Sequence, residues 1–153
     1  MLKYFFENEL VSYSEKTITD WREAISESCQ QLLNKGIINQ TYIDEIITCV
    51  EKHGPYIVIV PQVAMPHSSD KSEGIFGTAI AFTKFKSPIV FESDDEEEKS
   101  ASLFFTLAAK NSEEHMENIQ NLSELLMTEG LIDQLVASES IEEYQRIMKE
   151  FNI

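Results

Sequence analysis

The stretch GPYIVIVPQVAMPH, residues 54–67, decides the fold. It follows a segment with helical spacing, and the glycine and proline at its start end that helix. Residues 56–60 are a continuous run of apolar and β-branched side chains, a pattern that predicts a strand buried on both faces. The chain then makes a turn bounded by Pro61 and Pro66, and His67 follows the second proline. The stretch therefore predicts a buried strand and a turn that presents a histidine.

Helical and strand patterns lie on both sides of this stretch. Helical spacing and capping signals predict helices over residues 21–35, 41–53, from Ser112, over 131–136 and from Ser140. Apolar runs predict further strands over residues 75–83, 89–91 and 101–109. The last helix is expected to bury Ile141 and Tyr144. Because helices flank a central group of strands, we expect an α/β fold in a single domain covering residues 1–153.

The composition excludes several classes of protein. The chain has 153 residues, 42% of them apolar, and a formal net charge of −15. A surface this negative repels nucleic acid and anionic membranes, so we expect neither nucleic-acid binding nor direct membrane binding. Residues 92–98 hold six acidic residues and are predicted to form a solvated loop. The apolar runs are too short for a membrane span, and the first residues lack the features of a signal peptide, which predicts a cytoplasmic protein.

Common catalytic motifs are missing from the sequence. The five glycines are scattered, so there is no glycine-rich phosphate loop, and no Gly-x-Ser-x-Gly motif is present. Cys29 and Cys49 lie in separate helical stretches and are expected to be buried, reduced thiols. We therefore expect no metal and no cofactor.

Two histidines remain as candidates for chemistry. His67 lies on a backbone constrained by Pro66, and the hydroxyls of Ser68 and Ser69 follow it as donors for an anion. His115 lies near the start of a helix, which favours a bound anion, on the same stripe as apolar residues one to three turns later. Each has a plainer interpretation, because His67 is also consistent with a surface residue and His115 with a hydrogen-bonded core residue. A metal site formed by the two histidines lacks a third ligand.

Residues 54–67, followed by AAKNSEEH at residues 108–115, resemble enzyme IIA of the bacterial sugar phosphotransferase system (PTS), type 2, of the fructose–mannitol superfamily. The stretch is most similar to the L-ascorbate branch, with the galactitol branch next, and the resemblance covers nearly the whole chain. It implies a mixed β-sheet flanked by helices on both faces. It also implies that His67 accepts a phosphoryl group from the phosphocarrier protein HPr and passes it to enzyme IIB, which serves a membrane enzyme IIC. His115 matches the second histidine, which helps to hold the phosphoryl group.

Some positions differ from the family pattern. Val60 stands where members usually have glycine or alanine, and Ser68 follows the histidine. Glu51 and Pro61 stand where mannitol-type members have an arginine and a glutamate. Lys71 is then the candidate cation near the phosphoryl group.

The resemblance and the residues together predict a phosphotransferase for L-ascorbate or a related carbohydrate. An unperturbed imidazole is largely neutral at cytoplasmic pH, so His67 has a lone pair for attack on phosphorus. His115, Ser68 and Ser69 are the expected phosphoryl-binding residues. Two alternatives stay open: a regulatory module of the same fold that controls a protein partner, and an acidic structural domain in which His67 is inert. The sequence also leaves open whether the chain forms a homo-oligomer.

Overall fold

The computed structural model describes residues 1–68, 72–91 and 99–153. The helices are α1 (Leu2–Glu7), α2 (Trp21–Ser28), α3 (Gln30–Asn34), α4 (Gln40–His53), α5 (Ser112–Leu126), α6 (Leu131–Ala137) and α7 (Ile141–Phe151). The strands are β1 (Val11–Tyr13), β2 (Val58–Val60), β3 (Gln62–Ala64), β4 (Ala79–Phe91) and β5 (Lys99–Ala108).

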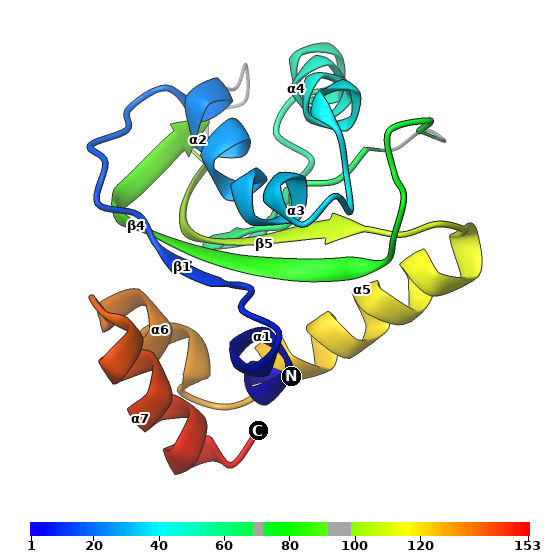
Figure 1. Cartoon of the computed structure of the whole chain (residues 1–153). Coiled ribbons are helices and arrows are strands. Elements are labelled where there is room, and N and C mark those ends of the chain that lie inside the picture. Colours follow the sequence, from blue (N-terminus) through cyan, green and yellow to red (C-terminus); the bar gives the residue numbers. More distant parts are fainter. Residues whose placement is uncertain (69–71, 92–98) are drawn as a thin grey trace.

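The strands form one mixed sheet in the order β1-β4-β5-β3-β2. β4 pairs with β5 and β2 with β3 in antiparallel fashion, whereas β1 is parallel to β4 and β3 is parallel to β5. Helices α2, α3 and α4 cover one face of the sheet, and α1, α5, α6 and α7 lie on the other (Figure 1). This confirms the predicted α/β fold, with a mixed β-sheet and α-helices on both faces.

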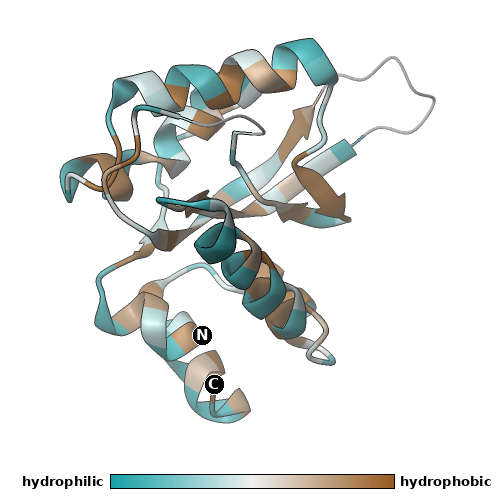
Figure 2. Cartoon of the chain, turned by 90° about the vertical axis from the view of Figure 1, so that its right-hand side faces the viewer, coloured by the Kyte–Doolittle hydropathy of each residue, from teal (hydrophilic) through white to brown (hydrophobic). Residues whose placement is uncertain are grey.

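Each face of the sheet has its own apolar core. Side chains alternate along a strand, so Phe82 of β4 packs toward α6 and α7 while Phe85 packs toward α2 and α4. Inward residues of the helices, such as Ile46 of α4 and Tyr144 of α7, are fully buried. In Figure 2, hydrophilic and hydrophobic residues alternate along the helices, as expected when one side of each faces a core. The termini meet where the Met1 amino group donates to the Ile153 carbonyl at 2.9 Å.

The strand predicted at residues 56–60 is shorter and less buried than expected. β2 comprises only Val58–Val60, and Ile59 and Val60 are 40% and 39% exposed. Among the described strands, β2 lies at the edge of the sheet and pairs with β3 alone. The prediction of burial on both faces was wrong. Residues of the expected turn form β3, which takes the position beside β5 and leaves β2 at the edge of the sheet.

Other boundaries also differ from the sequence-based predictions. The two strands expected over residues 75–83 and 89–91 form the single strand β4, which has a register shift between Lys84 and Ile89. The helix expected over residues 21–35 is divided into α2 and α3 at Cys29. Ile141 is not buried but 40% exposed. The loop predicted over residues 92–98 lies outside the described residues.

Besides β3, two short elements near the start of the chain were not predicted from the sequence. α1 has six residues and β1 has three, too few to establish a helical or strand period. Cys29 and Cys49 are buried, as expected, and neither forms a disulfide bond within the described ranges. Within the described ranges, no helix has the length and apolar character needed to cross a membrane.

Candidate functional site

His67 lies just beyond the carboxyl end of β3, on a backbone fixed from both sides. The Met65 N–H donates to the Ile57 carbonyl at 2.8 Å, and the Leu107 N–H of β5 donates to the Pro66 carbonyl at 3.0 Å. These bonds extend the pairing of β3 past its last residue and hold the chain that leads into His67. The predicted turn therefore presents the histidine at an end of the sheet, a usual place for sites in α/β proteins.

The hydrogen bond of the His67 ring selects one tautomer. Nδ1 lies 2.6 Å from the Met65 carbonyl oxygen. A carbonyl oxygen can only accept, so Nδ1 carries the proton and Nε2 keeps the lone pair. Burial lowers the pKa of His67 below its ordinary value; the bond to Met65 opposes this shift and the neighbouring His115 adds to it. The imidazole is therefore neutral at neutral pH, with a free lone pair on Nε2.

Two tyrosines fix the segment around His67. The Tyr56 hydroxyl donates to the His67 carbonyl, and the Tyr56 ring and the imidazole meet in a T-shaped contact with ring centroids 5.3 Å apart. The Tyr42 hydroxyl donates to the Leu107 carbonyl at 2.5 Å and accepts from the Ser68 N–H at 3.4 Å. Because α4 supplies Tyr42 and the turn after α4 supplies Tyr56, that helix positions the histidine segment.

α5 brings His115 to the same place. The rings of His67 and His115 have centroids 5.4 Å apart and planes tilted by 44°. Asn111 caps the helix by accepting from the Glu114 N–H at 2.8 Å, and the Glu114 carboxylate accepts from the Thr78 hydroxyl at 2.7 Å. These bonds tie the first turn of α5 to the start of β4. Burial lowers the pKa of His115 as well, so it too is neutral at neutral pH.

The two histidines line a pocket of about 450 Å³, here called the His67 pocket. Its other lining residues are Tyr42, Ser68, Ser72, Ile75, Ala109, Lys110, Asn111 and Ser112. Three of the residues singled out from the sequence, His67, His115 and Ser68, are thus brought together. Ser69 and Lys71 lie outside the described residues.

Lys110 is a member of the pocket that the sequence analysis missed. It stands within the AAKNSEEH segment, directly before the cap of α5. Its position between the strand predicted over residues 101–109 and the helix predicted from Ser112 could have indicated a place at the end of the sheet, near His67. Glu51, at the position of the mannitol-type arginine, instead pairs with Arg22 at 3.0 Å and does not line the pocket. Pro61 lies between β2 and β3 and does not line it either. Among the described residues, Lys110 is therefore the cationic side chain that lines this pocket.

A neutral histidine with a fixed tautomer, a second imidazole and a cation in one pocket form an arrangement suited to phosphoryl transfer. Such transfer requires in-line positioning and stabilisation of charged oxygens more than covalent chemistry by the protein. No group of three or more potential metal-ligating side chains is found among the residues described.

Comparison with protein families agrees with this chemistry. Residues 4–151 match the family model described as "Phosphoenolpyruvate-dependent sugar phosphotransferase system, EIIA 2". The chain belongs to this family. It is therefore an enzyme IIA component of a sugar PTS, a phosphotransferase that relays phosphoryl groups.

Individual relatives agree on the family and differ in substrate. The mannitol-specific cryptic phosphotransferase enzyme IIA component of Escherichia coli K12 is 36% identical over 90% of this chain and 89% of its own. A solution structure under the same name aligns with a TM-score of 0.81, at 31% identity, over 97% of this chain and 98% of that one. The ascorbate-specific EIIA component of the same strain is 29% identical over 86% of this chain and 84% of its own. Mannitol IIA of E. coli, solved in complex with phosphorylated enzyme IIB, shares the fold at 21% identity and a TM-score of 0.73, over 91% of this chain and 94% of that one.

Proposed function

We propose that His67 is the phosphoryl acceptor of this enzyme IIA and that phospho-HPr is its donor. The observation that carries the proposal is the hydrogen bond between Nδ1 and the Met65 carbonyl, which leaves the Nε2 lone pair free. In the transfer, a P–N bond forms at His67 Nε2 as the P–N bond to the HPr histidine breaks, and the bonding pair returns to the HPr ring. The whole chain, residues 1–153, acts in this proposal as one type-2 IIA domain.

The rest of the pocket stabilises the transferred group. His115 donates a hydrogen bond to the phosphoryl oxygens, a role its ring fits because the two centroids are 5.4 Å apart. Ser68 and, from outside the described residues, Ser69 are further donors. Lys110 supplies a positive charge in place of the family's arginine, since it lines the same pocket. Charge-assisted contacts of this kind are the strongest hydrogen bonds that side chains make to phosphate.

The phosphoryl group then passes to a cysteine or histidine of a cognate enzyme IIB. The fold shared with a mannitol IIA solved in complex with phosphorylated IIB supports this partner. The carbohydrate is L-ascorbate or a related compound, and the similarity to the mannitol-specific cryptic component makes a hexitol the nearest alternative. A regulatory module would accept the phosphoryl group but fail to pass it to any IIB.

The test is an intact-mass measurement after incubation with phosphoenolpyruvate, enzyme I and HPr. Wild type is expected to gain one acid-labile phosphoryl group, and His67→Ala none. His53→Ala is the matched control, because His53 is exposed at the end of α4 and does not line the pocket. Phosphorylated His67→Ala would contradict the assignment. Incubation of phosphorylated wild type with ascorbate-type and mannitol-type IIB then identifies the branch.

A further inference from the structure

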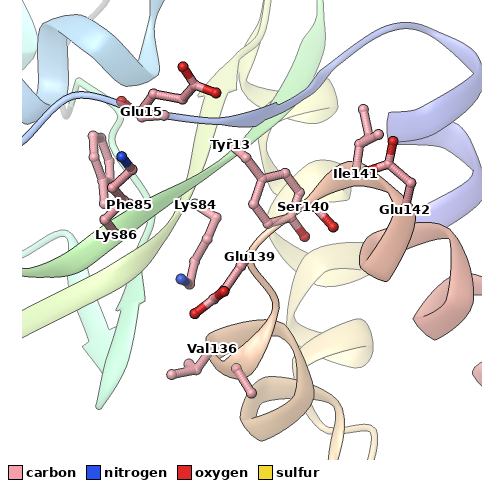
Figure 3. A pocket seen from close by; sticks show the side chains of 12 residues that line it. Tyr13, Glu15, Lys84, Phe85, Lys86, Val136, Glu139, Ser140, Ile141 and Glu142 are labelled. Atoms are coloured by element: carbon pink, nitrogen blue, oxygen red, sulfur yellow. The ribbon is translucent and has the colours of Figure 1, made fainter.

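A second pocket, of about 670 Å³, lies on the α6–α7 side of the sheet and shares no lining residue with the His67 pocket. It is here called the Lys84 pocket. Its walls come from the end of β1, the middle of β4 and the connection between α6 and α7 (Figure 3). Its volume is within the range of small-molecule sites.

The charge at its base is a buried lysine. Lys84 follows Phe82 on the face of β4 that packs toward α7, and the residue is only 6% exposed. Among the described residues it makes no salt bridge and no side-chain hydrogen bond. Most of the Lys84 residue is buried, but its ammonium nitrogen is not among the buried atoms that lack a partner and faces the pocket, where water or the charged group of a ligand can reach it. Burial accordingly lowers the pKa of Lys84, with Glu139 and Glu143 opposing the shift.

The surrounding groups define what could pair with Lys84. In Figure 3 its ammonium group and the carboxylate of Glu139 point toward one another, yet the two are too far apart to form a salt bridge. Glu15, Glu142 and a second lysine, Lys86, also line the pocket. These carboxylates would repel a simple anion from Lys84, and Lys84 would repel a simple cation from Glu139. A ligand that carries an anionic group and a cationic group as substituents of one carbon atom can pair with Lys84 and Glu139 at the same time.

Apolar side chains complete the pocket. Val136 and Ala137 at the end of α6 and Ile141 at the start of α7 line it, and Ile141 is 40% exposed although it is large and hydrophobic. We propose that the Lys84 pocket binds an aliphatic α-amino acid as its zwitterion. The carboxylate of the ligand contacts Lys84, its ammonium group contacts Glu139, and its side chain covers Val136 and Ile141. This site is independent of phosphoryl transfer at His67.

The test uses L-leucine and two analogues that each lack one charge, 4-methylpentanoate and 3-methylbutylamine. Each is titrated into the ¹⁵N-labelled full chain and followed by amide chemical shifts. L-leucine is expected to shift amides of the Lys84 pocket at millimolar concentrations, and both analogues to bind more weakly. Lys84→Met should weaken leucine binding by about tenfold or more, because it removes a charge-assisted contact. Lys52→Met, a change at an exposed lysine of α4 outside the pocket, should leave binding unchanged.

A surface variant keeps the test decisive if Lys84→Met does not fold. Glu139 is exposed, so Glu139→Gln preserves the fold and should weaken leucine binding without weakening 4-methylpentanoate binding. Absence of shifts in the pocket at millimolar leucine would overturn the proposal, as would equal binding of all three probes. Unchanged leucine affinity in Glu139→Gln would also overturn it. Phosphoryl acceptance by His67, measured by intact mass, is expected to be the same in every variant.

Discussion

The His67 pocket and the Lys84 pocket hold their polar groups in different ways. In the first, Nδ1 of the histidine donates to the backbone, and the hydroxyls of Tyr56 and Tyr42 both bind the peptide group that joins His67 to Ser68. In the second, the central ammonium group of Lys84 makes no salt bridge or side-chain hydrogen bond with the described residues. A group that must react repeatedly in one geometry benefits from fixed neighbours, whereas an unpaired charge is ready to be satisfied by a ligand. The comparison can be tested by changing matched residues in the two pockets.

After the complete loss expected in His67→Ala, the largest effect is expected from His115→Ala. The substitution removes a donor to the phosphoryl oxygens but leaves His67 and its tautomer intact. Acceptance from phospho-HPr should persist at a reduced level, and transfer to IIB should slow by about 10²–10³, the usual cost of losing one such donor. Rapid-quench measurement of the two half-reactions separates these effects. Complete loss of acceptance would show that His115 is needed before the phosphoryl group arrives.

A matched pair of tyrosine variants compares the two pockets directly. Tyr56→Phe removes the donor to the His67 carbonyl, and Tyr13→Phe removes a hydroxyl that lies 2.8 Å from the Ser138 hydroxyl beside the Lys84 pocket. Each should lower the free energy of unfolding by about 1 kcal/mol, because one hydrogen bond is lost. Only Tyr56→Phe should also slow phosphoryl acceptance, by about tenfold through misplacement of His67. Equal acceptance rates in both variants would contradict a positioning role for Tyr56.

Much of this site could be predicted because its residues are close in sequence to clear structural signals. The prolines at 61 and 66 bracket the turn before His67, and the start of the helix at Ser112 places His115 one turn in. Apolar patterning likewise predicted the layers of helices around the sheet. These features depend on local backbone preferences and on burial of one face, which a single sequence records.

What could not be predicted depends on pairing between distant segments. β3 has three residues, and it is a strand because β5 pairs with it. Tyr42 reaches the site through Leu107, which is 65 residues away. Lys84 lies just after the strand predicted over residues 75–83, and only the fold of the chain brings the α6–α7 connection beside it to form a pocket. The periodicity of a sequence predicts whether a segment is a helix or a strand, but not which distant segments pack against it. These contacts therefore could not be predicted.

A smaller effect is expected at the surface around the His67 pocket. Met116 is 63% exposed and follows His115, whereas Met127 is 83% exposed beyond the other end of α5. Exposed apolar side chains beside a site are favourable contacts for a docking protein. Met116→Ser should raise the KM for phospho-HPr several-fold with little change in kcat, since chemistry at His67 is untouched, and Met127→Ser should change neither. Steady-state kinetics distinguish the variants, and equal KM values would place the docking surface elsewhere.

The smallest effect concerns stability at acidic pH. Burial lowers the pKa of His67 and of His115 in the folded protein, so below about pH 6.5 the unfolded chain binds more protons than the folded one. The stability contributed by the neutral rings is fully present above the unfolded pKa and is lost as the pH falls through the folded pKa. The urea midpoint of wild type should therefore decline with acidification more steeply than that of the His67→Gln/His115→Gln variant. Lys84→Met should keep the wild-type decline, because lysine ordinarily titrates far above this range. A double variant that declines in parallel with wild type would show that the two imidazoles are protonated as readily in the folded protein as in the unfolded chain, and the neutral nucleophile at His67 would lose its physical basis.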